Sequence, residues 1–168
     1  CFVLMVKVQI IATIGPASSN FNIMKKMFDN GMDCVRINTK YGNIKQYESV
    51  LKCVSKLNLN KTKKCKILFD IKSNKYLPWL QKQKFDYLAI AFAESAKQVK
   101  EIKKILKNEK VKIISKIENK KGLANLGELI EVSNGIMVAR GDLGDNVPLE
   151  KLAIFQKEII RKCNKEKR

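Results

Sequence analysis

The sequence contains no histidine, and its 168 residues include only five cysteines, four arginines and one tryptophan. Five is a small and odd number of cysteines for a disulfide framework, and no Cys-x-x-Cys pair or neighbouring histidine points to a metal cluster. This use of cysteine is typical of a reducing compartment, so we expect a cytoplasmic protein.

Long apolar runs are missing too. Residues 1–6 are apolar, but Lys7 and Gln9 interrupt the stretch. A membrane-spanning helix needs about 20 apolar residues, and no signal-peptide cleavage pattern follows the stretch. We therefore expect neither a membrane segment nor a targeting segment.

Acidic residues are scarce, because 16 Asp and Glu face 34 Lys and Arg, which gives a net charge of +18. A net positive charge of this size attracts polyanions, and the affinity of a nucleic-acid binder would fall steeply as the salt concentration rises. Nearly all of the basic residues are lysine, however, which lacks the planar fork that arginine uses for bidentate contacts. The lysines are spread over every segment, with no aromatic residues interleaved among them. These observations disfavour nucleic-acid binding and favour a solvated, lysine-rich surface.

The remaining composition, 45% hydrophobic and 30% charged, is that of an ordinary globular domain. Short β-branched apolar runs alternate along the chain with amphipathic stretches. A short helix is expected near Pro78, one helix is expected to carry both Leu123 and Ile130, and Pro148 opens the last helix. The pattern predicts strands at residues 8–14, 34–38, 65–71, 87–92, 111–117 and 135–139.

Strict alternation of strands and helices predicts an α/β fold with a parallel sheet. The turn after the first strand reads Ile14-Gly15-Pro16-Ala17, so it lacks the Gly-x-Gly-x-x-Gly pattern of a doubly wound dinucleotide-binding sheet. A (β/α)₈ barrel fits the length of the units better, since eight of them take about 250 residues. We predict a single incomplete TIM-barrel domain over residues 1–168, with about six βα units.

Polar side chains gather where the predicted strands end, which is the edge at which parallel α/β proteins bind ligands. Neighbouring strands lie about 4.8 Å apart. Glu118 and Asp142, which follow adjacent predicted strands, are therefore expected to hold one hard divalent cation such as Mg²⁺, with water and substrate completing its shell. Three strand ends carry polar pairs two residues apart, whose members point to one side of the strand: Arg36 and Asn38, Asp70 and Lys72, Lys116 and Glu118.

A cation held beside Lys116 and Arg36 would form an anion site. The metal and the ammonium would draw charge from a phosphoryl group or an enolate, while the guanidinium fixes phosphate oxygens. This arrangement is typical of phosphoryl transfer. The alternative is that these charged side chains only pair with one another at the rim of the sheet.

Four segments closely resemble hallmark segments of the pyruvate kinase family, in the family's order. They are residues 10–18 (IIATIGPAS), 31–38 (GMDCVRIN), 116–119 (KIEN) and 135–144 (GIMVARGDLG). The resemblance implies a (β/α)₈ barrel, with a lid domain inserted after strand three and a further domain after the barrel. It also implies phosphoryl transfer between phosphoenolpyruvate and ADP in glycolysis, giving pyruvate and ATP, with Mg²⁺ and K⁺ as cofactors.

The resemblance assigns a role to each matching residue. Lys116 would be the catalytic lysine that stabilises the transferring phosphoryl group, and Arg36 would contact the phosphate. The other implied roles are magnesium binding by Glu118 and Asp142, potassium binding by Asn38 and Asp70, approach of the Gly141 and Asp142 backbone to the substrate carboxylate, and a further active-site lysine at Lys72.

The sequence also departs from the family pattern. Lys40 replaces a potassium-ligating serine and Ile71 a threonine, which puts the potassium site in doubt. Tyr41 replaces a nucleotide-contacting histidine, and Glu94 replaces an arginine. The short connection over residues 72–84 leaves no room for the lid, and the chain stops before strands seven and eight and the C-terminal domain.

These departures leave a second function open, that of a catalytically inactive or fragmentary pyruvate kinase-like protein. Such a protein would bind phosphorylated metabolites or associate with a full-length relative. Unpaired edges of an incomplete barrel also predict self-association.

Overall fold

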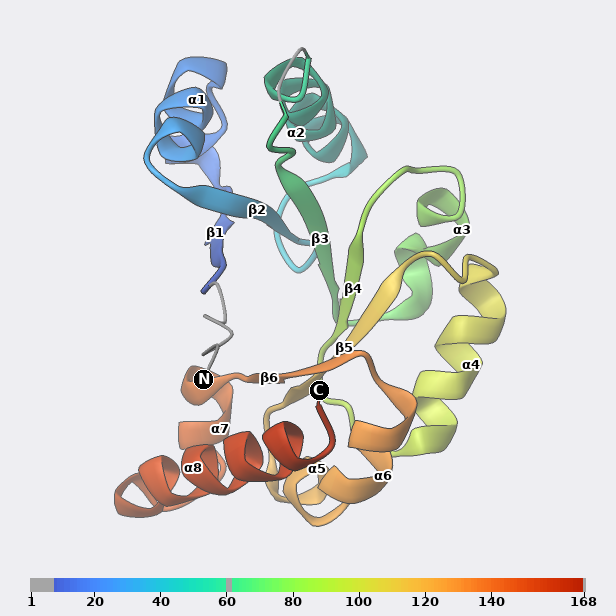
Figure 1. Cartoon of the computed structure of the whole chain (residues 1–168). Helices are drawn as coiled ribbons and strands as arrows, with labels where there is room; N and C mark the ends of the chain where they lie inside the picture. The colour runs from blue at the N-terminus through green and yellow to red at the C-terminus, as the bar shows by residue number, and fades with distance from the viewer. Residues whose placement is uncertain (1–7, 60–61, 168) are drawn as a thin grey trace, which may run out of the picture. The chain divides into compact units, whose positions relative to one another are not determined.

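The computed structural model describes residues 8–59 and 62–167 (Figure 1). Contacts between residues divide the chain into two compact units, with the boundary between Leu68 and Phe69. This boundary falls inside strand β3 (Lys66–Ile71). The two units are described separately below.

Unit 1 contains two strand–helix repeats and the beginning of β3. Its elements are β1 (Ile10–Thr13), the 3₁₀ turn η1 (Pro16–Ser18), α1 (Phe21–Asp29), β2 (Met32–Asn38) and α2 (Ile44–Leu57). The strand order is β1-β2-β3, and β1 runs parallel to β2, with Thr13 opposite Arg36.

Local sequence explains where the helices of unit 1 begin and end. The Asn20 and Asn43 side chains accept hydrogen bonds from backbone N–H groups of the first turns of α1 and α2. Gly31 follows α1 with a φ of +108°, the left-handed conformation that glycine adopts without strain. Both helices cover their strands with an apolar face, which buries Met24 in α1 and Val54 in α2.

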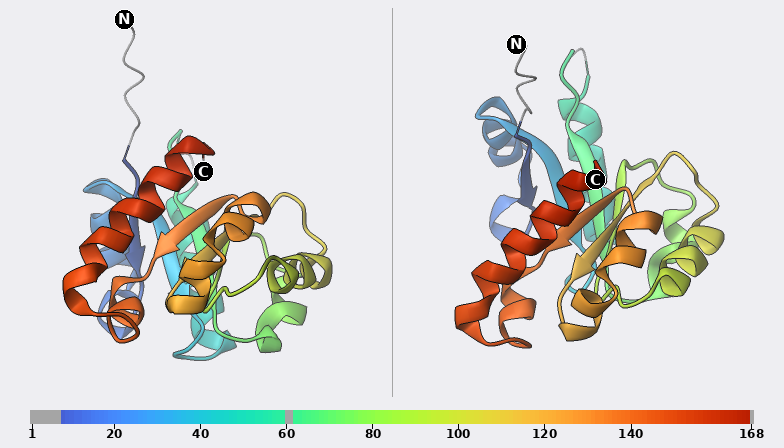
Figure 2. Two further views of the ribbon diagram at one scale, coloured as in Figure 1. Left: turned by 90° about the horizontal axis from the view of Figure 1, so that it is seen from below. Right: turned by 60° about the horizontal axis from the view of Figure 1, so that its bottom comes forward.

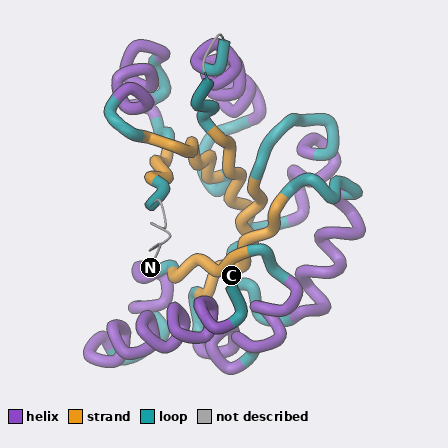
Figure 3. The backbone as a smooth tube through the Cα atoms, in the orientation of Figure 1, coloured by secondary structure: helices purple, strands orange, loops and turns teal. Residues whose placement is uncertain are grey.

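Unit 2 contains the end of β3 and three further strands in the order β3-β4-β5-β6. Pairs β4/β5 and β5/β6 are parallel, with Ile90 opposite Ser115 and Ile117 opposite Val138. Figure 3 shows these strands in orange, each leading through a loop to a helix. The elements after β3 are η2 (Asn74–Tyr76), α3 (Leu77–Leu80), β4 (Tyr87–Ile90), α4 (Ala96–Leu106), β5 (Lys112–Ile117), α5 (Lys120–Ala124), α6 (Leu126–Val132), β6 (Gly135–Val138), α7 (Arg140–Gly144) and α8 (Leu149–Lys165).

The helices of unit 2 pack against each other as well as against the strands. Helix α4 contacts α3 and α6, and α8 contacts α6, α7 and β6 (Figure 2). Fully buried side chains between these layers include Leu88, Val99, Ile113 and Leu129. Among the residues described here, no helix has both the length and the apolar character to cross a membrane.

The alternation of strands and helices and the parallel pairing confirm the predicted α/β class. Three local predictions were wrong. The helix expected to carry both Leu123 and Ile130 is two helices, because the chain bends at Asn125. Helix α7 was not anticipated, and β4 ends at Ile90 because Phe92 has a φ of +48°, outside the strand region.

Two helical glycines give a matched test of packing in unit 2. A methyl group on Gly122 in α5 would lie 2.8 Å from the backbone oxygen of Ala93, whereas one on Gly127 in α6 meets nothing within 4 Å. We expect Gly122→Ala to lower the free energy of unfolding by about 1–3 kcal/mol through overpacking. Gly127→Ala should raise it by roughly 0.5–1 kcal/mol, since alanine loses less backbone entropy in a helix. Urea unfolding followed by circular dichroism measures both, and a higher free energy of unfolding for Gly122→Ala would contradict the close packing at Gly122.

Candidate active site

A buried cluster of three charged side chains lies at the strand ends of unit 2. The Lys116 Nζ atom in β5 is 2.7 Å from Glu118 Oε1 and 3.1 Å from Asp70 Oδ2 in β3. Lys116 is 6% exposed, and Glu118 and Asp70 are 2% exposed. The structure thus confirms that Lys116 and Glu118 point to the same side of β5, as their spacing predicts.

Within this cluster, one ammonium contacts two carboxylates. Burying charge is costly unless each group is paired and hydrogen-bonded. Within the described residues, every buried side-chain nitrogen and oxygen atom has a hydrogen-bond partner. These contacts offset the cost of burying the charged groups.

Glu118 is also held by the backbone of the loop after β4. The Phe92 N–H donates to Glu118 Oε2 over 2.7 Å, and Lys116 contacts the other oxygen. The positive φ of Phe92 costs about 1–3 kcal/mol in a residue other than glycine. Gln98 stabilises this loop, because its Nε2 donates to the Phe92 oxygen over 3.3 Å and its Oε1 accepts from the Glu94 N–H over 3.0 Å. No local sequence signal identifies the contact between Phe92 and Glu118.

The segment after β6 is tied to the end of β5 by one amide side chain. Asn146 Nδ2 donates to the backbone oxygens of Asp142, over 2.8 Å, and of Glu118, over 3.2 Å. Gly141 and Asp142 lie in the first turn of α7 and are exposed. Sequence reasoning named both residues but missed Asn146.

The donor chemistry of these residues fits a hard divalent cation. Carboxylate oxygens are the ligands that Mg²⁺ takes from proteins, usually one or two of them, with water and phosphate oxygens completing the shell. Across the described ranges, no group of three or more Cys, Asp or Glu side chains is arranged to hold a metal. A magnesium site at Glu118 and Asp142 therefore remains a prediction, and it depends on substrate and water for its other ligands.

Glu94, which stands where the family pattern has arginine, pairs with a lysine in the first turn of α5. Its Oε2 lies 2.9 Å from Lys121 Nζ, and its Oε1 accepts from Asn119 Nδ2 over 2.7 Å. The hydrogen bonds from Lys121 and then Asn119 lower the pKa of the Glu94 carboxyl below its usual value. Asn119 in turn caps α5, because its Oδ1 accepts from the Gly122 N–H. The reversed charge is thus accommodated locally.

Lys72 lies close to the same loop. Its Nζ atom is 5.5 Å from the centroid of the Phe92 ring, and the side chain is exposed. The distance is within the range of a cation–π contact.

In unit 1, the predicted site residues contact their own neighbours. Arg36 Nη1 donates to Thr13 Oγ1 over 2.7 Å. Asn38 Oδ1 accepts from the Lys40 N–H over 3.0 Å, and the Lys40 ammonium lies 5.3 Å from the centroid of the Tyr41 ring. The side-chain oxygen of Asn38 thus already stabilises the turn that carries Lys40.

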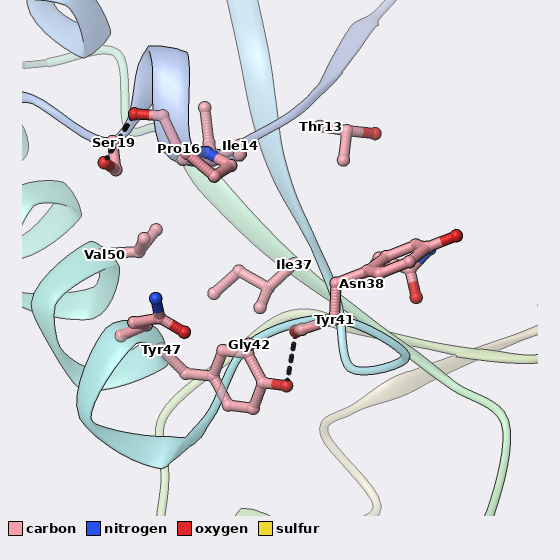
Figure 4. A pocket seen from close by; sticks show the side chains of 12 residues that line it. Thr13, Ile14, Pro16, Ser19, Ile37, Asn38, Tyr41, Gly42, Tyr47 and Val50 are labelled. Carbon is pink, nitrogen blue, oxygen red and sulfur yellow. Dashed lines mark hydrogen bonds between the residues drawn. The ribbon is translucent and has the colours of Figure 1, made fainter.

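Unit 1 also contains a pocket of about 300 Å³, shown in Figure 4. The Tyr47 hydroxyl donates to the Tyr41 backbone oxygen over 2.7 Å, which holds the loop that forms one wall. The pocket combines apolar walls with aromatic rings and a few polar groups, which suits a flat organic ring. Its lining includes Ile14, Pro16, Ile37, Asn38, Tyr41, Tyr47 and Val50.

Comparison with known proteins places these sites in a family. Residues 5–77 and 72–168 match the family model "Pyruvate kinase, barrel domain". The chain belongs to the pyruvate kinase family. Its six described strands are therefore strands of a pyruvate kinase barrel domain, which confirms the predicted fold class. The two matched blocks overlap at residues 72–77, where the structure has only η2 and the start of α3.

Individual pyruvate kinases match about half of the chain. The pyruvate kinase of Dictyostelium discoideum is 51% identical over 84 residues, which are 49% of this chain and 17% of that protein. The pyruvate kinase of Staphylococcus aureus (strain USA300) is 44% identical over 86 residues, 50% of this chain and 15% of that protein. The matched segment is thus less than a fifth of either relative.

Proposed function

We propose that this chain binds phosphoenolpyruvate together with Mg²⁺ and transfers its phosphoryl group to ADP, giving pyruvate and ATP. Membership of the pyruvate kinase family supports this function. The observation that carries it is the buried cluster of Lys116, Glu118 and Asp70, whose ammonium is held where parallel α/β proteins bind ligands. The function and the cysteine pattern both suit the cytoplasm.

Each residue of unit 2 has a distinct role in this proposal. Lys116 stabilises the negative charge of the transferring phosphoryl group, because an ammonium acts more strongly on such a charge in a buried site than in water. Glu118 and Asp142 hold Mg²⁺, which when bound neutralises phosphate charge. The exposed backbone of Gly141 and Asp142 receives the carboxylate of the substrate.

Unit 1 contributes separate parts of the proposal. Arg36 contacts phosphate oxygens through its planar guanidinium, which can donate two parallel hydrogen bonds. The pocket beside Tyr41 receives the base of ADP, since its apolar and aromatic walls suit a planar ring. The two potassium ligands that the resemblance implies are each engaged within their own unit, since Asn38 Oδ1 accepts from the Lys40 N–H and Asp70 contacts Lys116.

A second candidate function is binding of phosphorylated metabolites without turnover, alone or in association with a full-length relative. The short connection between β3 and β4 favours it, because η2 and α3 offer no lid to exclude water from the site. Exposed apolar residues suit association with a second copy or a relative, namely Ile10 and Ile11 in β1 and Leu149 and Ile154 in α8.

Calorimetry on the purified chain tests the proposal. We expect phosphoenolpyruvate to bind only with Mg²⁺, and Glu118→Ala and Asp142→Ala to weaken that binding at least about tenfold. Glu128→Ala, an exposed carboxylate in α6, is the matched control and should leave the affinity unchanged. An ADP phosphorylation assay on the same sample separates the two functions. Absence of binding by the folded chain would reject both.

A further inference from the structure

The contacts around Glu118 suggest how a cation enters the site. Glu118 Oε2 accepts from the Phe92 N–H over 2.7 Å, and Glu118 Oε1 contacts the Lys116 ammonium over 2.7 Å. Both oxygens are therefore already engaged, one by a backbone group and one by a flexible side chain. We propose that Mg²⁺ and the Lys116 ammonium compete for Glu118, so that binding of the metal releases Lys116 toward the phosphoryl ligand. This inference rests on the proposed magnesium site and adds the order in which its parts act.

The structure indicates which of the two partners gives way. The Phe92 N–H is part of a left-handed backbone segment that Gln98 holds through hydrogen bonds to the Phe92 oxygen and the Glu94 N–H. Moving this donor would require the loop to rearrange. The Lys116 ammonium sits on a stem of four carbons with several rotatable bonds, so it can leave Glu118 without moving the backbone.

Charge makes the exchange favourable. A magnesium ion binds carboxylate oxygen at about 2.0–2.1 Å, closer than the ammonium, and carries twice its charge. With the metal on Glu118, the ammonium would face a dication across a single oxygen and would keep only Asp70 as a partner. An ammonium released in this way is available to a phosphoryl group that also coordinates the metal.

The exchange predicts reciprocal coupling between the two ligands. If Mg²⁺ binding frees Lys116 for an anion, an anion that binds Lys116 must raise the affinity for Mg²⁺ by the same factor. Couplings of this kind typically span about 5-fold to 150-fold in affinity. Lys116 thus couples the affinity for the metal to the affinity for the phosphoryl ligand.

Amine labelling of the wild-type chain tests the exchange. The chain is treated with an acetylating reagent with and without MgCl₂, and the modification of each lysine is followed by peptide mass spectrometry. Lys116 is 6% exposed and should be protected without the metal, and saturating Mg²⁺ should raise its labelling rate at least about fivefold. Lys25, in an exposed ion pair with Asp29, is the internal control, and its labelling rate should not change with Mg²⁺.

Calorimetric titration with MgCl₂ accompanies the labelling, and Lys116→Met supplies a second measurement. Without a competing ammonium, this variant should bind Mg²⁺ about tenfold more tightly than the wild type in the absence of any anion. If Mg²⁺ binds in a Glu118-dependent manner but neither the labelling of Lys116 nor the affinity of the variant changes, the exchange is wrong and the metal site stands. If Mg²⁺ does not bind the wild type or the variant, both the site and the exchange are wrong. Should the variant not fold, the labelling of the wild type decides alone.

Discussion

Replacement of Lys116 by methionine is expected to lower the free energy of unfolding by about 3–5 kcal/mol, because it removes a buried ammonium that contacts two buried carboxylates. Glu118 and Asp70 are each 2% exposed, so water cannot take the place of the lost ammonium. Methionine keeps nearly the length and the apolar stem of lysine, which limits the loss of packing. Urea unfolding at neutral pH, in buffer without divalent cations, measures the effect.

Lys121→Met is the matched control for this prediction. Lys121 also pairs with a carboxylate, that of Glu94, but the two side chains are 66% and 33% exposed. An exposed pair of this kind contributes about 0–1 kcal/mol. Equal losses in the two variants would show that burial does not distinguish the pairs, contrary to the geometry of the Lys116 cluster.

Replacement of Phe69 by alanine should have an effect of similar size, about 3–5 kcal/mol, because it opens a cavity in a closely packed interior. Phe69 is fully buried in β3, and its ring makes edge-on contacts with Trp79, at 5.6 Å between centroids, and with Phe85, at 5.2 Å. Such aromatic pairs contribute about 0.5–1.5 kcal/mol beyond the burial of their surface. The chain has one tryptophan, so the fluorescence of Trp79 reports on this cluster directly.

Phe69→Leu separates the two parts of that effect. Leucine retains most of the buried volume and loses the aromatic contacts, so its cost should be less than half that of alanine. Chemical denaturation followed by Trp79 fluorescence compares the variants. If alanine and leucine cost the same, the cavity is not the source of the effect. Because Phe69 precedes Asp70, the alanine variant should also weaken the contact between Asp70 and Lys116.

Much of this architecture could be predicted from the periodicity of the sequence. The positions of six strands follow from short β-branched runs, and the pairing of Lys116 with Glu118 follows from the two-residue period of a strand. Asn20 and Gly31 mark the ends of α1 through capping preferences that act over a few residues. These signals depend on residues that lie close together in the sequence, so they can be recognised without the structure.

Features that depend on distant segments could not be predicted in this way. Asp70 contacts Lys116 across the intervening strand β4, a distance that the long lysine stem spans. Phe92 was assigned to a strand, although its contact with Glu118 bends the chain into a left-handed conformation. Asn146 ties α7 to β5 over 28 residues of sequence, and no local pattern records such a contact.

The partnership between Glu94 and Lys121 bears on how the departures from the family pattern are to be understood. A site that loses its purpose accumulates substitutions one at a time, and these leave orphaned charges and cavities behind. Position 94 instead carries a carboxylate that contacts the Lys121 ammonium in α5 and the amide of Asn119, the residue that caps this helix. An arginine at position 94 would place a second cation beside the Lys121 ammonium, so a carboxylate is the compatible side chain there. Glu94 is thus held by contacts that suit a carboxylate at this position.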